Sequence, residues 1–156
     1  MTDMLVRLYE IDEPISRNLA AQEPGIEIRP AIAPEKHIVT RWVTDEFAPN
    51  WASECEVAFS NHPVSCIVAV CANKLLGFAC YNATFKGALG PIGVLPSNRM
   101  QGVGRELLLY ALTNMRNQGY AYAIIGAAGP EAFFAKAVGA IPIDNSSPGP
   151  YKGMLT

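Results

Sequence analysis

A strand, a glycine-rich turn and an amphipathic helix follow one another over residues 91–118, and this unit constrains the fold more than any other part of the chain. The strand "PIGVLP" ends in a proline, and Gly102 and Gly104 stand where the helix begins. The helix carries Leu and Ala residues at helical spacing on one face, and Gly119 follows its end. A strand that leads into a helix in this way predicts a layered α/β fold.

The remaining patterns place this unit inside one domain. Strands are predicted at "MLVRLYEI" and "GIEIRPAI", helices over 34–47 and 51–61, a β-hairpin over 65–84, a strand at "YAYAII" and a helix at "PEAFFAKAVG". The segment "SRNLAAQE" is typical of a brief helix or a loop, and "AIPID" and "YKGML" are expected to pair as a final hairpin. This order predicts a single domain with a mixed sheet and helices on both faces.

Composition excludes several classes of function. Half of the 156 residues are hydrophobic and the formal net charge is −2, so the chain is expected to fold and has no global attraction to nucleic acid or an anionic membrane. The N-terminal residues lack the basic and long apolar regions of a signal peptide. The apolar runs are far shorter than the roughly 20 residues that span a bilayer. We therefore expect a cytoplasmic protein that binds neither nucleic acid nor membrane.

Four cysteines offer no recognisable site in the sequence. They are Cys55, Cys66, Cys71 and Cys80. No C-x-x-C pair is present, and no spacing to His37 or His62 resembles a zinc site. Most of these cysteines lie in apolar runs, where a free thiol behaves as a small buried hydrophobe. We expect neither a disulfide nor a metal.

The glycine turn has two nucleotide interpretations, and both fit poorly. The fingerprint G-x-G-x-x-G would need a third glycine where Leu107 stands, and a P-loop would need Gly-Lys after the turn. The N–H groups of a first helical turn nevertheless lack partners and favour anions, and glycines allow close approach. Arg99 and Gln101 add donors, so the turn is suited to a pyrophosphate. The alternative is a turn that only serves the entry into the helix.

At these residues the chain resembles the GNAT superfamily of N-acetyltransferases. The segment "VLPSNRMQGVGRELL" is similar to the family pattern, in which a strand ends in V-x-P and Q/R-x-x-G-x-G/A opens a helix. Arg99, Gly102 and Gly104 occupy the defining positions. The resemblance covers residues 26–156, leaving 1–25 as an N-terminal strand extension. It implies a mostly antiparallel mixed sheet.

The resemblance also implies the chemistry. Acetyl-CoA would be the acyl donor, and its acetyl group would pass by direct attack to a primary amine of a small molecule or a protein. A backbone N–H near Val94 would polarise the thioester carbonyl. The implied donor-binding residues are Val94, Leu95, Arg99, Met100, Gln101, Gly102, Val103, Gly104 and Arg105. The alternative is a non-catalytic acyl-CoA-binding or regulatory module with the same fold.

The proton carriers depart from the family pattern. Phe134 stands near the position where many members have a Tyr that acts as general acid, and the strand "GALGPIGV" lacks the Glu that some members use as base. Glu54, Glu56 and Tyr151 are candidate substitutes, with a solvated helix face or an edge strand as the alternative explanation.

Two further features bear on partners. Aromatic residues in the early helices and the C-terminal loop favour a hydrophobic or compact acceptor, and they are Trp42, Phe47, Trp51, Phe59 and Tyr151. The first strand and the C-terminal hairpin are expected at sheet edges, which would allow a homodimer.

Overall fold

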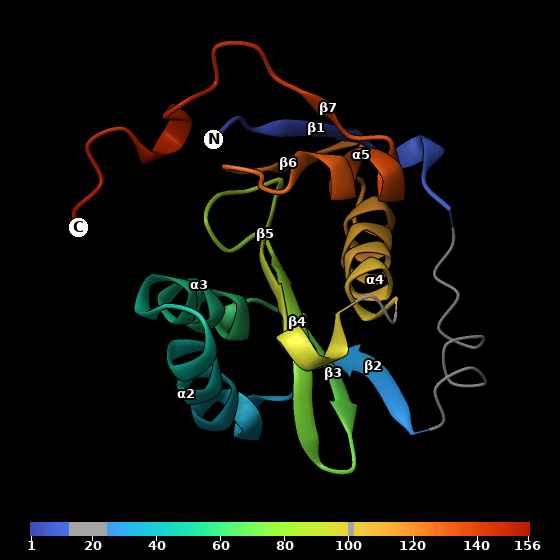
Figure 1. Ribbon diagram of the computed structural model, residues 1–156, viewed down its shortest axis with the longest axis vertical. Coiled ribbons are helices and arrows are strands. Elements are labelled where there is room, and N and C mark those ends of the chain that lie inside the picture. Colours follow the sequence, from blue (N-terminus) through green and yellow to red (C-terminus); the bar gives the residue numbers. More distant parts are fainter. Residues whose placement is uncertain (13–24, 100–101) are drawn as a thin grey trace.

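A single seven-stranded sheet organises the residues that the computed structural model describes, which are 1–12, 25–99 and 102–156 (Figure 1). The strands are β1 (Met4–Arg7), β2 (Ile26–Pro30), β3 (Cys66–Cys71), β4 (Lys74–Tyr81), β5 (Ala88–Val94), β6 (Tyr122–Ile125) and β7 (Ile141–Pro142). Their order is β2-β3-β4-β5-β6-β1-β7. Within the described parts of the chain, β5 and β6 pair in parallel and the other neighbours pair antiparallel. The predicted mixed, mostly antiparallel sheet is confirmed.

The helices cover both faces of this sheet. They are α2 (Lys36–Glu46), α3 (Pro49–Ser60), α4 (Val103–Asn117) and α5 (Glu131–Val138). Short 3-10 segments are η1 (Leu8–Glu10), η2 (Ala33–Glu35), η3 (Pro96–Asn98) and η4 (Gly149–Tyr151). In Figure 1, α2 and α3 lie together on one side of β4 and β5, and α4 lies on the other. Among the described helices, none is both long enough and apolar enough to cross a membrane.

Side-chain alternation along β3 and β4 divides the interior into two cores. Ile67 and Ala69 of β3 pack in the core that contains the apolar face of α4, whereas Cys66 and Val68 pack against α2 and α3. The same period of two is expected for a strand buried on both faces. The sheet therefore lies between the paired helices α2 and α3 on one face and the long helix α4 on the other.

The N-terminal strand lies inside the sheet. Strand β1 pairs with β6 on one side and with β7 on the other, so the expectation that it forms an exposed edge is wrong. The predicted boundary between 1–25 and 26–156 stays a prediction. The segment "SRNLAAQE" falls within 13–24, outside the described residues.

The predicted C-terminal hairpin is also wrong. Ile141 pairs with β1, and "YKGML" does not form its partner strand. The sequence Pro148-Gly149-Pro150 leads instead into the 3-10 turn η4. Gly153 has a φ of 77°, a left-handed conformation that interrupts an extended strand in this segment, and the strand that contains Ile141 pairs with β1.

A β-bulge separates β5 from β6. Residues 79–81 of β4 face residues 89–92 of β5, so β5 contains one additional residue around Gly90 and Pro91. Gly90 has a φ of 137°, a conformation that favours glycine. A bulge bends its strand, and Pro91 has no N–H to donate to a neighbour. The parallel pairing with β6 accordingly covers Ala88 and Leu89, and β5 continues beyond it along β4 alone.

Candidate functional site

The second half of β5, after Leu89, has no described partner strand on its β6 side. Leu95 donates its N–H to Leu76 O at 2.9 Å, so the backbone groups of Leu95 and Gly93 point toward β4. Because successive residues of a strand alternate, those of Ile92 and Val94 point the other way. These two amides lie beyond the last β5–β6 pair. An extended ligand with amide groups can pair with β5 here as an additional strand does.

Gly93 lets the helix layer approach β5 closely. A Cβ at this position would lie 2.7 Å from Phe47 Cζ. The ring of Phe47 also stacks on Trp51 with centroids 5.4 Å apart and contacts Trp42 edge-on. These half-buried aromatic rings form a wall on the α2–α3 side of the strand.

The N-terminus of α4 is directed at the same strand. Gly102 caps the helix with a φ of 81° and has no side chain. The backbone N–H of Glu106 donates to Gly102 O at 3.1 Å, which is the first described hydrogen bond of the helix. The preceding N–H groups of the first turn have no intrahelical acceptors. A Cβ on Gly104 would contact Val94 at 3.5 Å, so the turn packs against the end of β5. This end of α4 is suited to an anion.

The two arginines of this turn have defined positions. Arg99 donates from Nε to Val94 O at 3.1 Å, which ties the turn to the strand. Arg105 lies 3.5 Å from Asp12 and 3.6 Å from Glu106. Met100 and Gln101 of the predicted donor site lie outside the described residues.

Two of the three candidate proton carriers come together around Thr84. Glu54 of α3 accepts a hydrogen bond from Thr84 Oγ1 at 2.5 Å, and the side chain of Thr84 also acts on Tyr151 of η4, whose pKa it lowers. The hydroxyl of Tyr151 lies against Gly126, where a Cβ would collide with it. Gly126 directly follows the last residue of β6 that pairs with β5. The cluster of Glu54, Thr84 and Tyr151 therefore lies where the two strands separate.

Burial perturbs both ionisable groups of this cluster. Burial raises the pKa of Glu54, and the hydrogen bond from Thr84 offsets part of this increase. Burial also raises the pKa of Tyr151, and the negative charges of Glu54 and Asp3 add to that effect. At neutral pH Tyr151 thus retains its proton, and Glu54 is a stronger base than an exposed carboxylate.

A buried carboxylate from the N-terminus supports the loop beside Tyr151. Asp3 is 7% exposed and accepts the N–H of Ala127 at Oδ1, at 2.8 Å. Its backbone N–H donates to Ser146 Oγ at 2.9 Å, and its other carboxylate oxygen lies against Gly149. Asp3 therefore joins the loop after β6 to the segment that carries Tyr151. Neither Asp3 nor Thr84 has a local sequence signal, because their partners are distant along the chain.

Other candidates lie elsewhere. Glu56 is exposed on α3 and points away from Thr84's partner Glu54, two residues earlier. His37 and His62 are exposed, and Phe59 is buried in the core. Phe134 is also buried in the core, and its phenyl ring cannot donate a proton.

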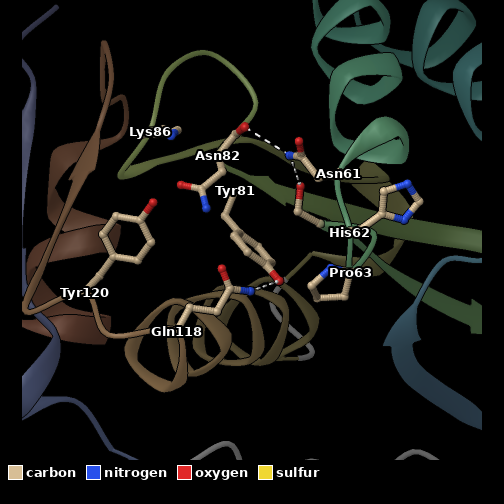
Figure 2. Close-up of a pocket in the computed structure, with 9 residues that line it drawn as sticks. Asn61, His62, Pro63, Tyr81, Asn82, Lys86, Gln118 and Tyr120 are labelled. Carbon is tan, nitrogen blue, oxygen red and sulfur yellow. Dashed lines mark hydrogen bonds between the residues drawn. The ribbon is translucent and has the colours of Figure 1, made fainter.

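Figure 2 shows a polar pocket of about 200 Å³ at the opposite end of α4. There Gln118 donates to the Tyr81 hydroxyl at 3.1 Å, and Asn61 donates to Ser65 Oγ at 2.9 Å. Helix α4 has 15 residues and spans about 22 Å at 1.5 Å per residue. This pocket is therefore separate from the glycine-capped end of the helix.

Comparison with known proteins assigns the family. The sequence profile of the acetyltransferase (GNAT) family matches residues 35–139. The chain belongs to the GNAT family. The match contains α2 through α5, and thus the bulged strand β5 and the turn into α4. No curated protein matches the chain significantly.

Solved structures share the GNAT fold. A GCN5-related glucosamine N-acetyltransferase region of a fungal multi-domain β-N-acetylglucosaminidase has a TM-score of 0.73 at 12% identity, over 91% of this chain and 19% of that one. A GCN5-related N-acetyltransferase from Sphaerobacter thermophilus has a TM-score of 0.65 at 17% identity, over 91% of this chain and 48% of that one. A GNAT acetyltransferase from Brucella melitensis in complex with acetyl-CoA has a TM-score of 0.52 at 22% identity, over 70% of this chain and 80% of that one. The chain thus spans less than half the length of the first two.

Proposed function

We propose that this GNAT domain transfers an acetyl group from acetyl-CoA to a primary amine. The observation that carries the proposal is the cluster of Glu54, Thr84 and Tyr151 beside the start of β5, where β5 and β6 separate. The other end of β5 packs against the glycine-capped N-terminus of α4. The complex of the Brucella melitensis relative with acetyl-CoA supports the choice of donor.

The free side of β5 and the start of α4 would hold the donor. The backbone groups of Ile92 are available for its pantetheine chain. Val94 offers its N–H, which is suited to the thioester carbonyl, because its own carbonyl accepts from Arg99. The N–H groups of Val103, Gly104 and Arg105 would bind the pyrophosphate, with the helix dipole in the favourable sense. Acetyl-CoA supplies an acyl carbon that an amine can attack directly.

Glu54 would accept the proton of the incoming ammonium group. Its raised pKa makes it a better acceptor than an exposed carboxylate, and the hydroxyl of Thr84 holds its orientation. Because a protonated Glu54 can accept nothing, activity should fall as the pH drops through this raised pKa. In Glu54→Gln, the decrease in activity on the acid side of the pH–rate profile should disappear.

Tyr151 would hold the proton that neutralises the leaving thiolate. Its pKa is raised, so the phenol is protonated across the neutral range. Thr84 interacts with both Tyr151 and Glu54, so its hydroxyl would offer a route for the proton taken from the amine to reach Tyr151. Tyr151 would thus take the role of the tyrosine that Phe134 replaces.

The acceptor would enter from the α2–α3 side. Trp42, Phe47 and Trp51 form the aromatic wall there and favour an amine with an apolar or compact body. Small molecules and protein amino groups both fit this description. The proposal includes a cytoplasmic location and a homodimer.

The test compares two neighbouring carboxylates of α3. Free thiol release from acetyl-CoA is measured across a panel of amines for the wild type, Glu54→Gln and Glu56→Gln. General-base catalysis typically contributes 10²–10⁴-fold, so Glu54→Gln should reduce kcat by about 100-fold or more while Glu56→Gln retains wild-type rates.

Calorimetry with acetyl-CoA distinguishes the alternative functions. Binding without thiol release for any amine would favour a non-catalytic acyl-CoA-binding module. Absence of both binding and release would contradict the proposal entirely.

A further inference from the structure

Three thiols from three different elements meet between the paired helices and the sheet. They are Cys55 of α3, Cys66 of β3 and Cys80 of β4, and all three are fully buried. Their sulfur atoms lie within 4.8 Å of one another, and those of Cys55 and Cys80 are 3.7 Å apart. We call this group the thiol triad.

Secondary structure brings the triad together. Cys66 and Cys80 are directly opposed in the β3–β4 ladder, so their side chains leave the same face of the sheet as neighbours. Cys55 lies on the buried face of α3, with Ala52 and Ala58. These small neighbours allow the helix to approach the sheet. No sequence spacing reveals the group, because its members lie on separate elements.

We propose that the thiol triad is a binding site for one thiophilic metal ion, of the class of Cu(I), held by three sulfur ligands. A metal–thiolate bond is about 2.3 Å long, so three sulfurs around one ion in a trigonal plane lie about 4 Å apart. The shortest observed separation of 3.7 Å and the limit of 4.8 Å bracket that value. Only small side-chain adjustments would be needed for binding.

The ligand set argues for a soft ion of low coordination number. Among the described residues, no further His, Cys, Asp or Glu joins the group, whereas a structural zinc site is tetrahedral with four ligands. Thiolates favour soft ions, and Cu(I) is among those they select. The triad belongs to a buried hydrophobic cluster that also contains Val43 and Phe78.

Metal binding to the triad also depends on pH, because the thiolate rather than the thiol is the metal ligand. A bound cation would take the place of thiol protons, which are released to solvent, so affinity should increase with pH.

Copper titration of the chain tests the site. The reduced protein is loaded without oxygen, both as folded protein and by refolding with Cu(I), in competition with a chromophoric Cu(I) chelator. We expect one tightly bound Cu(I) per chain, and at least a 100-fold loss of affinity in Cys55→Ala and Cys80→Ala. Cys71→Ala is the matched control, because Cys71 lies on β3 outside the triad, and its affinity should be unchanged.

X-ray absorption of the loaded wild type makes the test independent of how the variants fold. We expect about three sulfur scatterers near 2.3 Å and no nitrogen or oxygen ligand. Absence of binding by either route, nitrogen or oxygen ligands, or equal loss in Cys71→Ala would overturn the proposal. Metal affinity and metal–sulfur distances are measured without amine or acetyl-CoA, so the outcome is scored independently of any acetyl-transfer assay.

Discussion

At the scale of single residues, burial of Glu54 makes it a stronger base and also lowers the stability of the folded protein. A folded-state pKa above the ordinary value of 4.5 means that the folded protein retains the proton where the unfolded chain has lost it. The free energy of unfolding therefore falls as the pH rises from about 4.5 through the raised pKa. The cost is therefore larger at neutral pH than at pH 4.

Glu54→Gln should consequently raise the melting temperature at neutral pH while it removes activity. The amide carries no charge to desolvate and can still accept from Thr84. Glu56→Gln should leave the melting temperature unchanged, because Glu56 is exposed. Differential scanning calorimetry at pH 7 and pH 4 measures both, and the difference between Glu54→Gln and the wild type should shrink at the lower pH. A destabilised Glu54→Gln at pH 7 would contradict this interpretation.

Tyr151→Phe should lower kcat about 10-fold or more with little change in acceptor KM, since it removes a proton donor and retains the ring. The control is Tyr122→Phe. Tyr122 is an exposed tyrosine whose ring contacts Tyr9. Steady-state kinetics on both variants is the measurement. Equal rates for Tyr151→Phe and the wild type would assign the proton to another donor.

At the scale of elements, α4 and its glycine cap are predictable from the sequence because their signals are local. The apolar face, the positions of Gly102 and Gly104, and the preceding strand lie within about 30 residues of one another. The bulge in β5 and the contact of Glu54 with Thr84 depend on pairing between distant segments, which periodicity does not encode. The C-terminal hairpin was predicted from local strand propensity, but β1 pairs with Ile141 instead.

Gly102→Ala should weaken the binding of acetyl-CoA about 10-fold and cost roughly 1–2 kcal/mol of stability, the usual penalty for a left-handed residue with a side chain. Gly119→Ala provides the control. Gly119 also has a positive φ, of 101°, at the other end of α4. It should lose similar stability and keep its affinity. Isothermal titration calorimetry and urea unfolding separate the two effects, and equal affinities would argue against a donor site at this turn.

At the scale of the whole molecule, both termini take part in building the site. Strand β1 lies within the sheet, and Asp3 at its start holds the loop after β6 and the segment that carries Tyr151. The sequence indicated an extension here, because β1 precedes the part that resembles the family. Its place between β6 and β7 follows from long-range pairing alone.

Leu8→Ala should therefore destabilise the entire domain by about 2–5 kcal/mol, as expected for truncating a fully buried leucine. Tyr9→Ala, at an exposed neighbouring position, should cost much less. Urea denaturation followed by circular dichroism gives both values. A negligible effect of Leu8→Ala would mean that residues 1–25 form a dispensable extension.

The location of the donor site is tested most directly by following backbone amide resonances during titration with CoA. The largest shifts should occur at Ile92, Val94 and the first turn of α4, with smaller shifts at Gly126 and Thr84. Shifts confined to the polar pocket around Gln118 and Tyr120, at the far end of α4, would contradict the proposed donor site.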